Sequence, residues 1–423
     1  MNADIDPNLT ASSEFVKNLN SAFLTDDQET IEELLRELVG EDPNAIIELS
    51  NDDWMKDPSV HLPPAVLLGL HPLQYKQELT TPLRIAAAYG FTHCLQYLLE
   101  HGARPNLIVG GKSALHDACE NSSSECTEFL LKGGADPHLR TEEGLSALHL
   151  CKTPKSLRSC AMVLLEHGAA ADLPSEEDDE TALHVASRSA LLHHAKLYLQ
   201  SGADVNHTSI RGETPLGVAC ASSQDPEVLL QICRLLLSYG ADVNLADKEQ
   251  RTPLHKAAHN IQHSLVTLLL EHKAEVNTFD HNGRLPLSCV LHSAAVKAER
   301  EPHRVAQILL NHGSIKLWPQ ALPKALSMCS AEPKTVEVLF NSYTHIPVTC
   351  QWEKTIQAET LQIHQQFYQS LFALGCRPRC LQHLCRAAIR PHFGKDCHRL
   401  IPQLLIPKAL QLYLLLEPVG IIR

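Results

Sequence analysis

Aromatic residues and long apolar segments are both scarce in this sequence. Phe, Trp and Tyr make up 5% of its 423 residues, while helix formers such as Leu and Ala are abundant. Because the strands of sandwiches and barrels favour aromatic and β-branched residues, this composition favours a helical protein over those folds. No apolar run reaches the roughly 18 residues that cross a bilayer, which argues against a membrane protein.

A secretion signal is also missing from the first residues. The stretch MNADIDPNLTASSEF has neither the basic start nor the apolar core of a signal peptide. Fourteen cysteines in a chain without an export signal are expected to be reduced thiols. We therefore expect a cytoplasmic protein, with the nucleus as a second location.

Positive charge is in short supply, except at the C-terminal end. The chain has 36 Lys and Arg against 49 Asp and Glu, a net charge of -13, so a nucleic acid is not an expected partner. Residues 376–423 contain 8 Lys and Arg but only 2 Asp and Glu, a balance of +6 that leaves -19 for the rest. This C-terminal tail is therefore electrostatically a separate region.

Motifs for catalysis and cofactor binding are absent. The sequence has no GxSxG elbow for a serine nucleophile, no GxxxxGKS/T phosphate loop and no CxxC pair. We therefore expect no catalytic residue, no cofactor and no metal. A crowd of cysteines and histidines leaves a zinc-dependent enzyme as the least favoured alternative. These residues are Cys376, Cys380, His383, Cys385, His392, Cys397 and His398.

One pattern recurs seven times in the middle of the chain. It begins with stretches such as TPLRIAAAYG at 81 and TPLHKAAHNI at 252, and it continues with stretches such as LLEHGARPN and LLSYGADVN. The leucines that align the copies are 32 to 38 residues apart, a spacing typical of stacked repeats. These leucines are Leu83, Leu115, Leu148, Leu183, Leu216, Leu254 and Leu287.

Each copy predicts two helices. A Thr or Ser before the leucine caps the first helix, and proline fits its first turn. Small residues such as Ala86 and Ala257 let the two helices approach, and pairs such as Leu236 and Leu237 give the second helix an apolar face. A glycine such as Gly202 ends that helix in the left-handed conformation. Because one pair cannot bury its own apolar faces, the copies must stack.

The repeat period and the motifs TPLHxAA and LLxxGADVN resemble those of the ankyrin repeat over residues 79–313. The resemblance implies an all-α solenoid of about seven clear repeats with degenerate caps. Histidines such as His116 and His255 stand where an imidazole can bond the neighbouring hairpin backbone. The pattern is degenerate in places: Gly217 replaces the usual histidine and Lys273 replaces the usual glycine. An insertion around SSQDPEV predicts a longer loop between two helices.

Weaker helical patterns flank the repeats. ETIEELLREL from residue 29 and NAIIEL from residue 44 predict amphipathic helices that cap the first repeat. LPKALSMCSAEPKTVEVLFNSY from residue 322 predicts a degenerate eighth pair, and WEKTIQAETLQIHQQFYQSLFAL from residue 352 predicts further helix. We therefore expect an N-terminal helical cap region, the repeats, a degenerate connecting region and a C-terminal domain. Their predicted ranges are 1–78, 79–313, 314–375 and 376–423.

The tail predicts a small bundle of three short helices. Leu381, Cys385 and Ile389 lie four residues apart and share one face of the first helix, which Pro391 is expected to end. A second helix is expected over 395–400, and the third after Pro407. Such a bundle is too small to be very stable alone, and no flexible linker separates it from the repeats, so we expect it to dock on them.

This tail resembles the SOCS box. The elongin-binding segment of that family has a leucine, a cysteine four residues later and an aliphatic residue after four more, as at Leu381, Cys385 and Ile389, with Leu384 beside them. The cullin-selecting segment resembles LPLPxxLxxYL, but Leu405 stands where the pattern has its first proline. The resemblance assigns cullin binding to Leu404, Ile406, Pro407, Leu410, Tyr413 and Leu414.

Together, the two resemblances imply a non-catalytic substrate-recognition subunit of a cullin-5 RING ubiquitin ligase. The tail would bind elongin C, elongin B and cullin-5 with its RING subunit. The repeats would hold an unidentified protein on their concave side for ubiquitination and proteasomal degradation. A scaffold whose tail only caps the repeats stays open as an alternative, because of Leu405 and the missing linker. The loops expected to face a target are 109–112, 141–144, 175–180, 210–212, 248–251 and 281–284.

Overall fold

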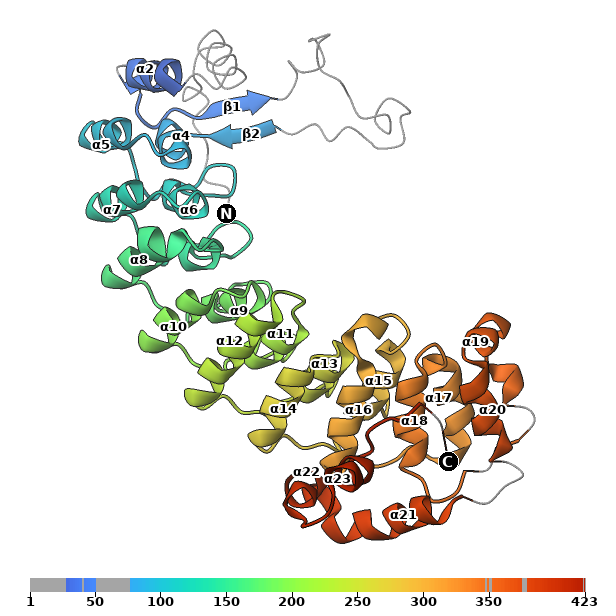
Figure 1. Ribbon diagram of the computed structural model, residues 1–423. Coiled ribbons are helices and arrows are strands. Elements are labelled where there is room, and N and C mark those ends of the chain that lie inside the picture. The colour runs from blue at the N-terminus through green and yellow to red at the C-terminus, as the bar shows by residue number, and fades with distance from the viewer. Residues whose placement is uncertain are drawn as a thin grey trace. The chain divides into compact units, whose positions relative to one another are not determined.

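The computed structural model describes residues 28–39, 42–50, 77–346, 348–349, 352–374, 379–420 and 422. They form two compact units: the first holds the described residues of Met1–Ala186 and His193–Asp204, and the second those of Ser187–Leu192 and Val205–Arg423. Both are helical, as predicted, apart from a two-stranded ribbon in the first (Figure 1). No helix within the described segments is long and apolar enough to cross a bilayer.

The predicted domain boundaries are not tested by these two units and stay predictions. The boundary between residues 375 and 376 lies outside the described residues, as does most of the predicted cap region.

The first unit begins with the predicted capping helix. The segment ETIEELLREL lies in α2 (Gln28–Val39), which packs its buried Ile31 and Leu35 against the first repeat. Successive helical pairs follow, and over residues 82–166 each packs against the next (Figure 1). The elements are α4 (Pro82–Tyr89), α5 (Thr92–Glu100), α6 (Ala114–Glu120), α7 (Ser124–Lys132), the 3-10 helix η2 (Ala147–Leu150), the π-helix η3 (Leu157–Ala161), α8 (Met162–Glu166), α9 (Ala182–Arg188) and α10 (Leu192–Gln200).

The predicted helix at NAIIEL is wrong. Its residues enter strand β1 (Ile47–Ser50), which pairs antiparallel with β2 (Gln77–Thr80), so that Ile47 lies opposite Thr80. Isoleucine at two successive positions has high strand propensity. The partner strand is supplied by a segment 27 or more residues away, which a local pattern does not reveal.

In the second unit, two rows of helices run through the repeats. The first helices of successive repeats pack against one another, and so do the second helices. The first row is α11 (Pro215–Ala221), α13 (Pro253–His259), α15 (Pro286–Ser293) and α17 (Leu322–Cys329). The second row is α12 (Pro226–Ser238), α14 (His263–Glu271), α16 (Pro302–Asn311) and α18 (Pro333–Asn341). The pair α17 and α18 is the predicted eighth repeat.

The insertion around SSQDPEV lengthens a helix more than a loop. The connection over residues 222–225 is only one residue longer than the 260–262 connection of the next repeat. In contrast, α12 has 13 residues where α14 has 9. Asp225 caps the added turn through its carboxylate, which accepts the Glu227 N–H at 2.9 Å, and Pro226 fills the first helical position. The predicted long loop is therefore wrong.

The repeat histidines bond as predicted. His116 accepts the Ser113 N–H at Nδ1 (3.1 Å) and donates from Nε2 to the Leu139 carbonyl (3.0 Å), so it ties its helix to the next hairpin. His255 repeats this arrangement with the Arg284 carbonyl. Burial lowers the pKa of His116 to about 4, which keeps the imidazole neutral.

The left-handed helix ends are also confirmed. Gly202 and its counterparts in the other repeats have φ between 84° and 90°. Lys273, which replaces one of these glycines, has φ 66° and keeps the same bond from its N–H to the carbonyl three residues earlier, that of Leu270. A non-glycine residue adopts this conformation only at a cost.

The chain ends in a series of short helices on the second unit. The connecting region contains η6 (Glu353–Thr355), α19 (Ala358–Ile363) and α20 (Gln365–Ala373). The tail contains α21 (Leu381–Phe393), η7 (Gly394–Asp396), α22 (Cys397–Leu400), η8 (Ile401–Gln403) and α23 (Lys408–Leu414).

The predicted end of α21 at Pro391 is wrong by two residues. Proline removes a single N–H near the end of the helix, and one further N–H, from Gly394, still bonds to the Arg390 carbonyl. Gly394, with φ 54°, ends the helix instead.

Candidate functional site

The apolar face of α21 points away from the rest of the protein. Leu381 is 77% exposed, Leu384 46% and Ile389 39%, and Cys385 is exposed between them. These four residues are the predicted elongin-binding set. The structure brings them together on one solvent-facing stripe, although contact with a partner stays a prediction.

The opposite face of α21 is polar and buried. His383 donates from Nε2 to the Tyr343 carbonyl (2.7 Å), and its Nδ1 accepts from the Arg386 guanidinium (2.9 Å). Arg386 also lies over the ring of Tyr413, 4.2 Å from its centroid. Burial, together with the cations Arg379 and Arg386, lowers the pKa of His383 to about 4. The imidazole is therefore neutral at pH 7 and can accept this bond.

Two further arginines hold the tail on the ends of repeat helices. Arg390 donates to the Asn311 side chain (2.8 Å) and to the Leu310 carbonyl (3.2 Å) at the end of α16. Arg379 donates to the Phe340 carbonyl (3.0 Å) at the end of α18. The last carbonyls of a helix lack partners within it and carry partial negative charge, so cations stabilise them. The arginines are thus the caps of two repeat helices.

The segment after α23 returns to the repeats. The buried carboxylate of Glu337, on α18, accepts the N–H groups of Val419 (2.7 Å) and Gly420 (2.8 Å). The side chains of Gln307 and Asn311 both donate to the Leu415 carbonyl. Sequence reasoning missed these contacts, because they join residues more than 80 positions apart.

Close packing at Gly313 also joins the repeats to the tail. A methyl group added at this glycine would lie 2.9 Å from the Lys395 Cβ atom. The neighbouring rings of His312 and His398 are stacked with their centroids 3.6 Å apart. The tail therefore docks on the repeats, as its lack of a linker predicts.

The predicted cullin-binding residues divide between a core and the surface. Leu414 is buried with Cys397 and Ile401 in a small core of the tail, and Leu404 and Ile406 pack against it. Pro407 precedes α23, Leu410 is exposed on this helix, and Tyr413 lies under Arg386. Leu405 projects fully into solvent at 104% exposure. Cullin contact by any of them stays a prediction.

The crowded cysteines and histidines of the tail are dispersed in the structure. Cys380 and Cys385 are exposed, whereas Cys397 is buried and donates to the Gly394 carbonyl (3.3 Å). His383 is held by the contacts described above, and Cys376 lies outside the described residues. Within the described ranges, no group of three or more metal-binding side chains is arranged to hold an ion.

The loops predicted to face a target are linked in series within each unit. In the first, the Glu142 N–H donates to Gly111 and the Glu176 N–H to Gly144. In the second, the Lys248 N–H donates to Arg211 and the His281 N–H to Glu249. These bonds turn separate loops into a continuous edge, but its contact with a target stays a prediction.

Comparison with known proteins identifies both halves of this arrangement. The model for ankyrin repeats (3 copies) matches residues 65–141, 130–209, 192–280 and 229–318, and the model for the SOCS box matches residues 377–415. Human ankyrin repeat and SOCS box protein 18 is 45% identical to the chain over 466 aligned positions, which cover 100% of this chain and 99% of the relative. Human ankyrin repeat and SOCS box protein 10 is 40% identical, over 90% of the chain and 82% of the relative. Human ankyrin repeat and SOCS box protein 16 is 37% identical, over 84% and 78%. The chain belongs to the ankyrin repeat and SOCS box protein family.

Proposed function

We propose that this protein is the substrate-recognition subunit of an elongin B/C–cullin-5 RING ubiquitin ligase. Its family supports the broader role of an adaptor, rather than a catalytic subunit, in a cullin-RING ligase. The finer assignment rests on one observation: α21 exposes the apolar stripe of Leu381, Leu384, Cys385 and Ile389 while its polar side is buried. A helix that served only to cap the repeats would turn its apolar side toward them.

Elongin C is the partner we propose for this stripe. Leu381 is more exposed than Leu384 and Ile389, and burial of a leucine in a partner's pocket stabilises a contact by roughly 2 kcal/mol. Cys385 acts beside it as a small apolar residue whose thiol chemistry is not used. Elongin B would join through elongin C.

Cullin-5 is the partner we propose for the segment from Leu404 to Leu414. Leu410 is exposed on α23, and Leu405 lies fully exposed in the preceding loop. The buried Leu414 and the partly buried Leu404 and Ile406 would shape this surface from beneath, since they form the small core of the tail. Leu405 replaces the family's first proline, so its backbone is less restricted before binding.

The repeats would hold the target while the RING subunit and its ubiquitin-charged enzyme perform the chemistry. This chain contributes proximity and orientation. The polar contacts of Arg379, Arg390 and Glu337 hold the tail on the last repeats. A target bound to those repeats would therefore be presented at a set position relative to the ligase. The target would then be ubiquitinated and degraded by the proteasome.

The test is affinity purification of the full chain carrying Leu381→Ser together with Cys385→Ser. We expect loss of elongin C, elongin B and cullin-5, with an unchanged thermal unfolding temperature, because both side chains are exposed. Ile363→Ser is the matched control, since Ile363 on α19 is 74% exposed. Undiminished elongin capture by the double variant would contradict the proposal. Mass spectrometry of ubiquitin remnants, with and without the tail, would identify the target.

A scaffold without ligase activity is the second candidate function. It is favoured by Leu405, which departs from the cullin-selecting pattern and is fully exposed. Purification of the wild-type chain separates the candidates: elongins together with cullin-5 support the ligase, and elongins without cullin-5 support the scaffold.

We also propose a cytoplasmic location. Twelve of the fourteen cysteines are described as free thiols, and most of them are buried, as suits a reducing compartment. Fluorescence microscopy of the tagged chain tests this, and the nucleus is the alternative outcome.

A further inference from the structure

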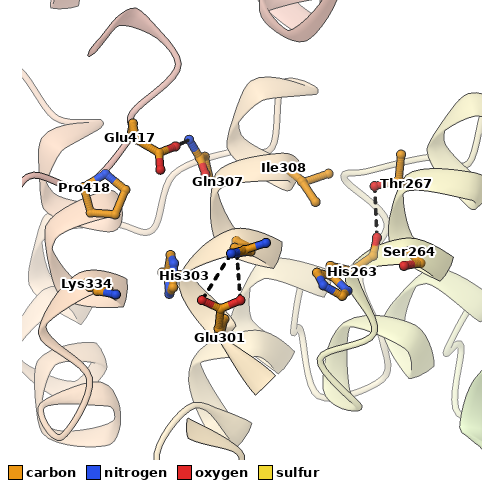
Figure 2. A pocket seen from close by; sticks show the side chains of 11 residues that line it. His263, Ser264, Thr267, Glu301, His303, Gln307, Ile308, Lys334, Glu417 and Pro418 are labelled. Atoms are coloured by element: carbon orange, nitrogen blue, oxygen red, sulfur yellow. Dashed lines mark hydrogen bonds and ion pairs between the residues drawn. The ribbon is translucent and has the colours of Figure 1, made fainter. Parts of the chain in front are cut away.

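A polar pocket of about 590 Å³ lies in the second unit, away from the exposed stripe of α21. The first two turns of α14 and α16 and the start of α18 line it, together with Glu417 and Pro418 from the segment after α23. Figure 2 shows His263, His303, Lys334 and Glu417 around this space. The size is in the range of sites that bind small ligands or side chains.

The acidic groups of the pocket already have partners. Glu301 forms an ion pair with Arg304, at 2.8 Å between carboxylate Oε2 and guanidinium Nε, and Glu417 accepts from the Gln307 side chain (3.0 Å). Figure 2 shows both interactions as dashed lines. The Glu301 carboxylate is thus charge-paired with Arg304, whereas the Glu417 carboxylate is bonded only to a neutral amide and keeps further acceptor sites.

Lys334 and His303 are polar groups of the pocket that have no partner in any described segment. In the described part of the chain, no hydrogen bond or ion pair reaches the ammonium group of Lys334. His303 is only 7% exposed, and its Nδ1 atom is buried without a hydrogen-bond partner among the described residues. A buried polar atom left unpaired costs roughly 1–3 kcal/mol, so a ligand that supplies its partner would be stabilised by this imidazole.

The surroundings of His303 favour a negatively charged ligand. His303 and Lys334 each occupy the second position of their helices, where backbone N–H groups and the helix dipole favour anions. The capping residues Glu301 and Glu332 make no capping bond with their side chains. Burial lowers the pKa of His303, with further lowering by Lys334 and Arg304, while Glu301 and Glu417 oppose it. The neutral ring can carry its proton on Nδ1 and donate it.

We propose that this pocket binds the carboxylate of an acidic side chain in a protein segment, held by the Lys334 ammonium group and the His303 Nδ1–H. One free ammonium matches one carboxylate in charge, whereas Glu301 and Glu417 at the same pocket oppose a doubly charged group. The inference deepens the proposed function. That this segment belongs to a target of the ligase rests on that function. The inference defines the class of that target segment as acidic.

Fluorescence anisotropy with labelled dodecapeptides tests the pocket on the full chain. The probes are a peptide of alternating Glu and Gly, its Gln analogue and its Lys analogue. We expect the Glu peptide to bind most tightly. Lys334→Gln should weaken its binding about tenfold, because it removes a charge-assisted bond. Lys324→Gln is the matched control, since Lys324 is exposed on α17 outside the pocket, and it should change binding less than twofold.

A second variant tests the imidazole directly. His303→Phe keeps the ring volume but removes both nitrogens, and it should weaken the Glu peptide at least threefold, with folding checked by thermal unfolding. The proposal is overturned if the Gln peptide binds equally well, if the Lys peptide binds best, if Lys334→Gln has no effect, or if no saturable binding is seen up to about 1 mM.

Elongin capture keeps this proposal separable from the ligase proposal. Lys334→Gln should retain elongin C fully, because the pocket and the exposed stripe share no residue. Loss of peptide binding with intact elongin capture would show that the pocket binds the peptide independently of the elongin-binding stripe. Failure of the wild-type chain to capture elongin C would reject the ligase role and leave the peptide result standing.

Discussion

The helices of the repeats and helix α21 bury opposite kinds of side chain. In the repeats, α14 buries Leu265, Val266 and Leu269 and leaves His263 exposed. In the tail, α21 buries His383 and Arg386 and leaves Leu381 exposed. Both helices are amphipathic, so amphipathicity by itself does not say which face is inside. The groups that each helix meets decide this.

The ends of α16 and α18 explain the inversion of α21. They present carbonyl groups and the Asn311 side chain, which need donors rather than apolar atoms. Arg379 and Arg390 supply these donors, and His383 donates to the Tyr343 carbonyl just after α18, so the apolar face is left free for a partner. The cost is desolvation of the guanidinium groups, which lowers the pKa of Arg386 and of Arg390 from their ordinary values.

The largest effect is expected from breaking the buried face. Arg390→Met keeps a flexible, unbranched side chain but removes the bonds of the guanidinium group to Leu310, Asn311 and Leu414. We expect the opening of α21 to become easier by about 2 kcal/mol, since bonds to a charged group are lost and their acceptors stay buried. Amide hydrogen exchange in α21 measures this. Leu381→Ser, on the exposed face, is the control and should change exchange little; equal effects of both substitutions would contradict the inversion.

Acidification should weaken the same face by a smaller amount. The folded pKa of His383 is about 4, below the ordinary value of about 6.5, so the unfolded state binds the proton more readily. Its contribution is complete above pH 6.5 and is lost as the pH falls toward 4. After allowance for solvent screening, we expect this group to lower the free energy of unfolding by about 1 kcal/mol at pH 5 relative to pH 7.

Thermal unfolding at pH 7 and pH 5 measures this effect of acid. His383→Gln, whose amide can both donate and accept, should lose less stability than the wild type between these values. Other buried histidines such as His116 contribute equally to both proteins. If the wild type and the variant lose the same stability between pH 7 and pH 5, His383 is excluded as the responsible group.

The smallest effect should come from correcting an irregular repeat. Lys273→Gly restores the residue that the left-handed conformation favours, so it should stabilise the second unit by about 0.5–1 kcal/mol. Chemical denaturation of the full chain measures the change. Gly240→Lys, at the equivalent position of the preceding repeat with φ 88°, should cost a similar amount. Destabilisation by Lys273→Gly would show that the lysine side chain, rather than its backbone, matters there.

Much of the repeat region could be predicted because its interactions recur at a constant separation. The bond from His116 to Leu139 has its counterpart in that from His255 to Arg284, and one such histidine suggests the others. Strand β1 was missed because its partner lies beyond a long intervening segment. The first turn of α12 was taken for a loop because the proline at Pro226 fits the start of a helix as well as a turn.

The candidate site was only half predictable. Leu381, Cys385 and Ile389 are visible as a stripe in the sequence, and the opposite stripe of Arg379, His383, Arg386 and Arg390 is equally regular. A basic stripe usually faces solvent, so nothing local indicated that this one is buried. The free Nδ1 of His303 could not be seen at all, because it depends on the packing of three repeats and the returning tail.

The order of residues along the chain thus set the repeats, their caps and the two faces of α21, since each depends on neighbours within one or two turns. The tertiary structure decided which face of α21 stays free and where the pocket forms. Both depend on carbonyl groups and carboxylates that distant segments bring together, and the free energy of burying a charge depends on those partners.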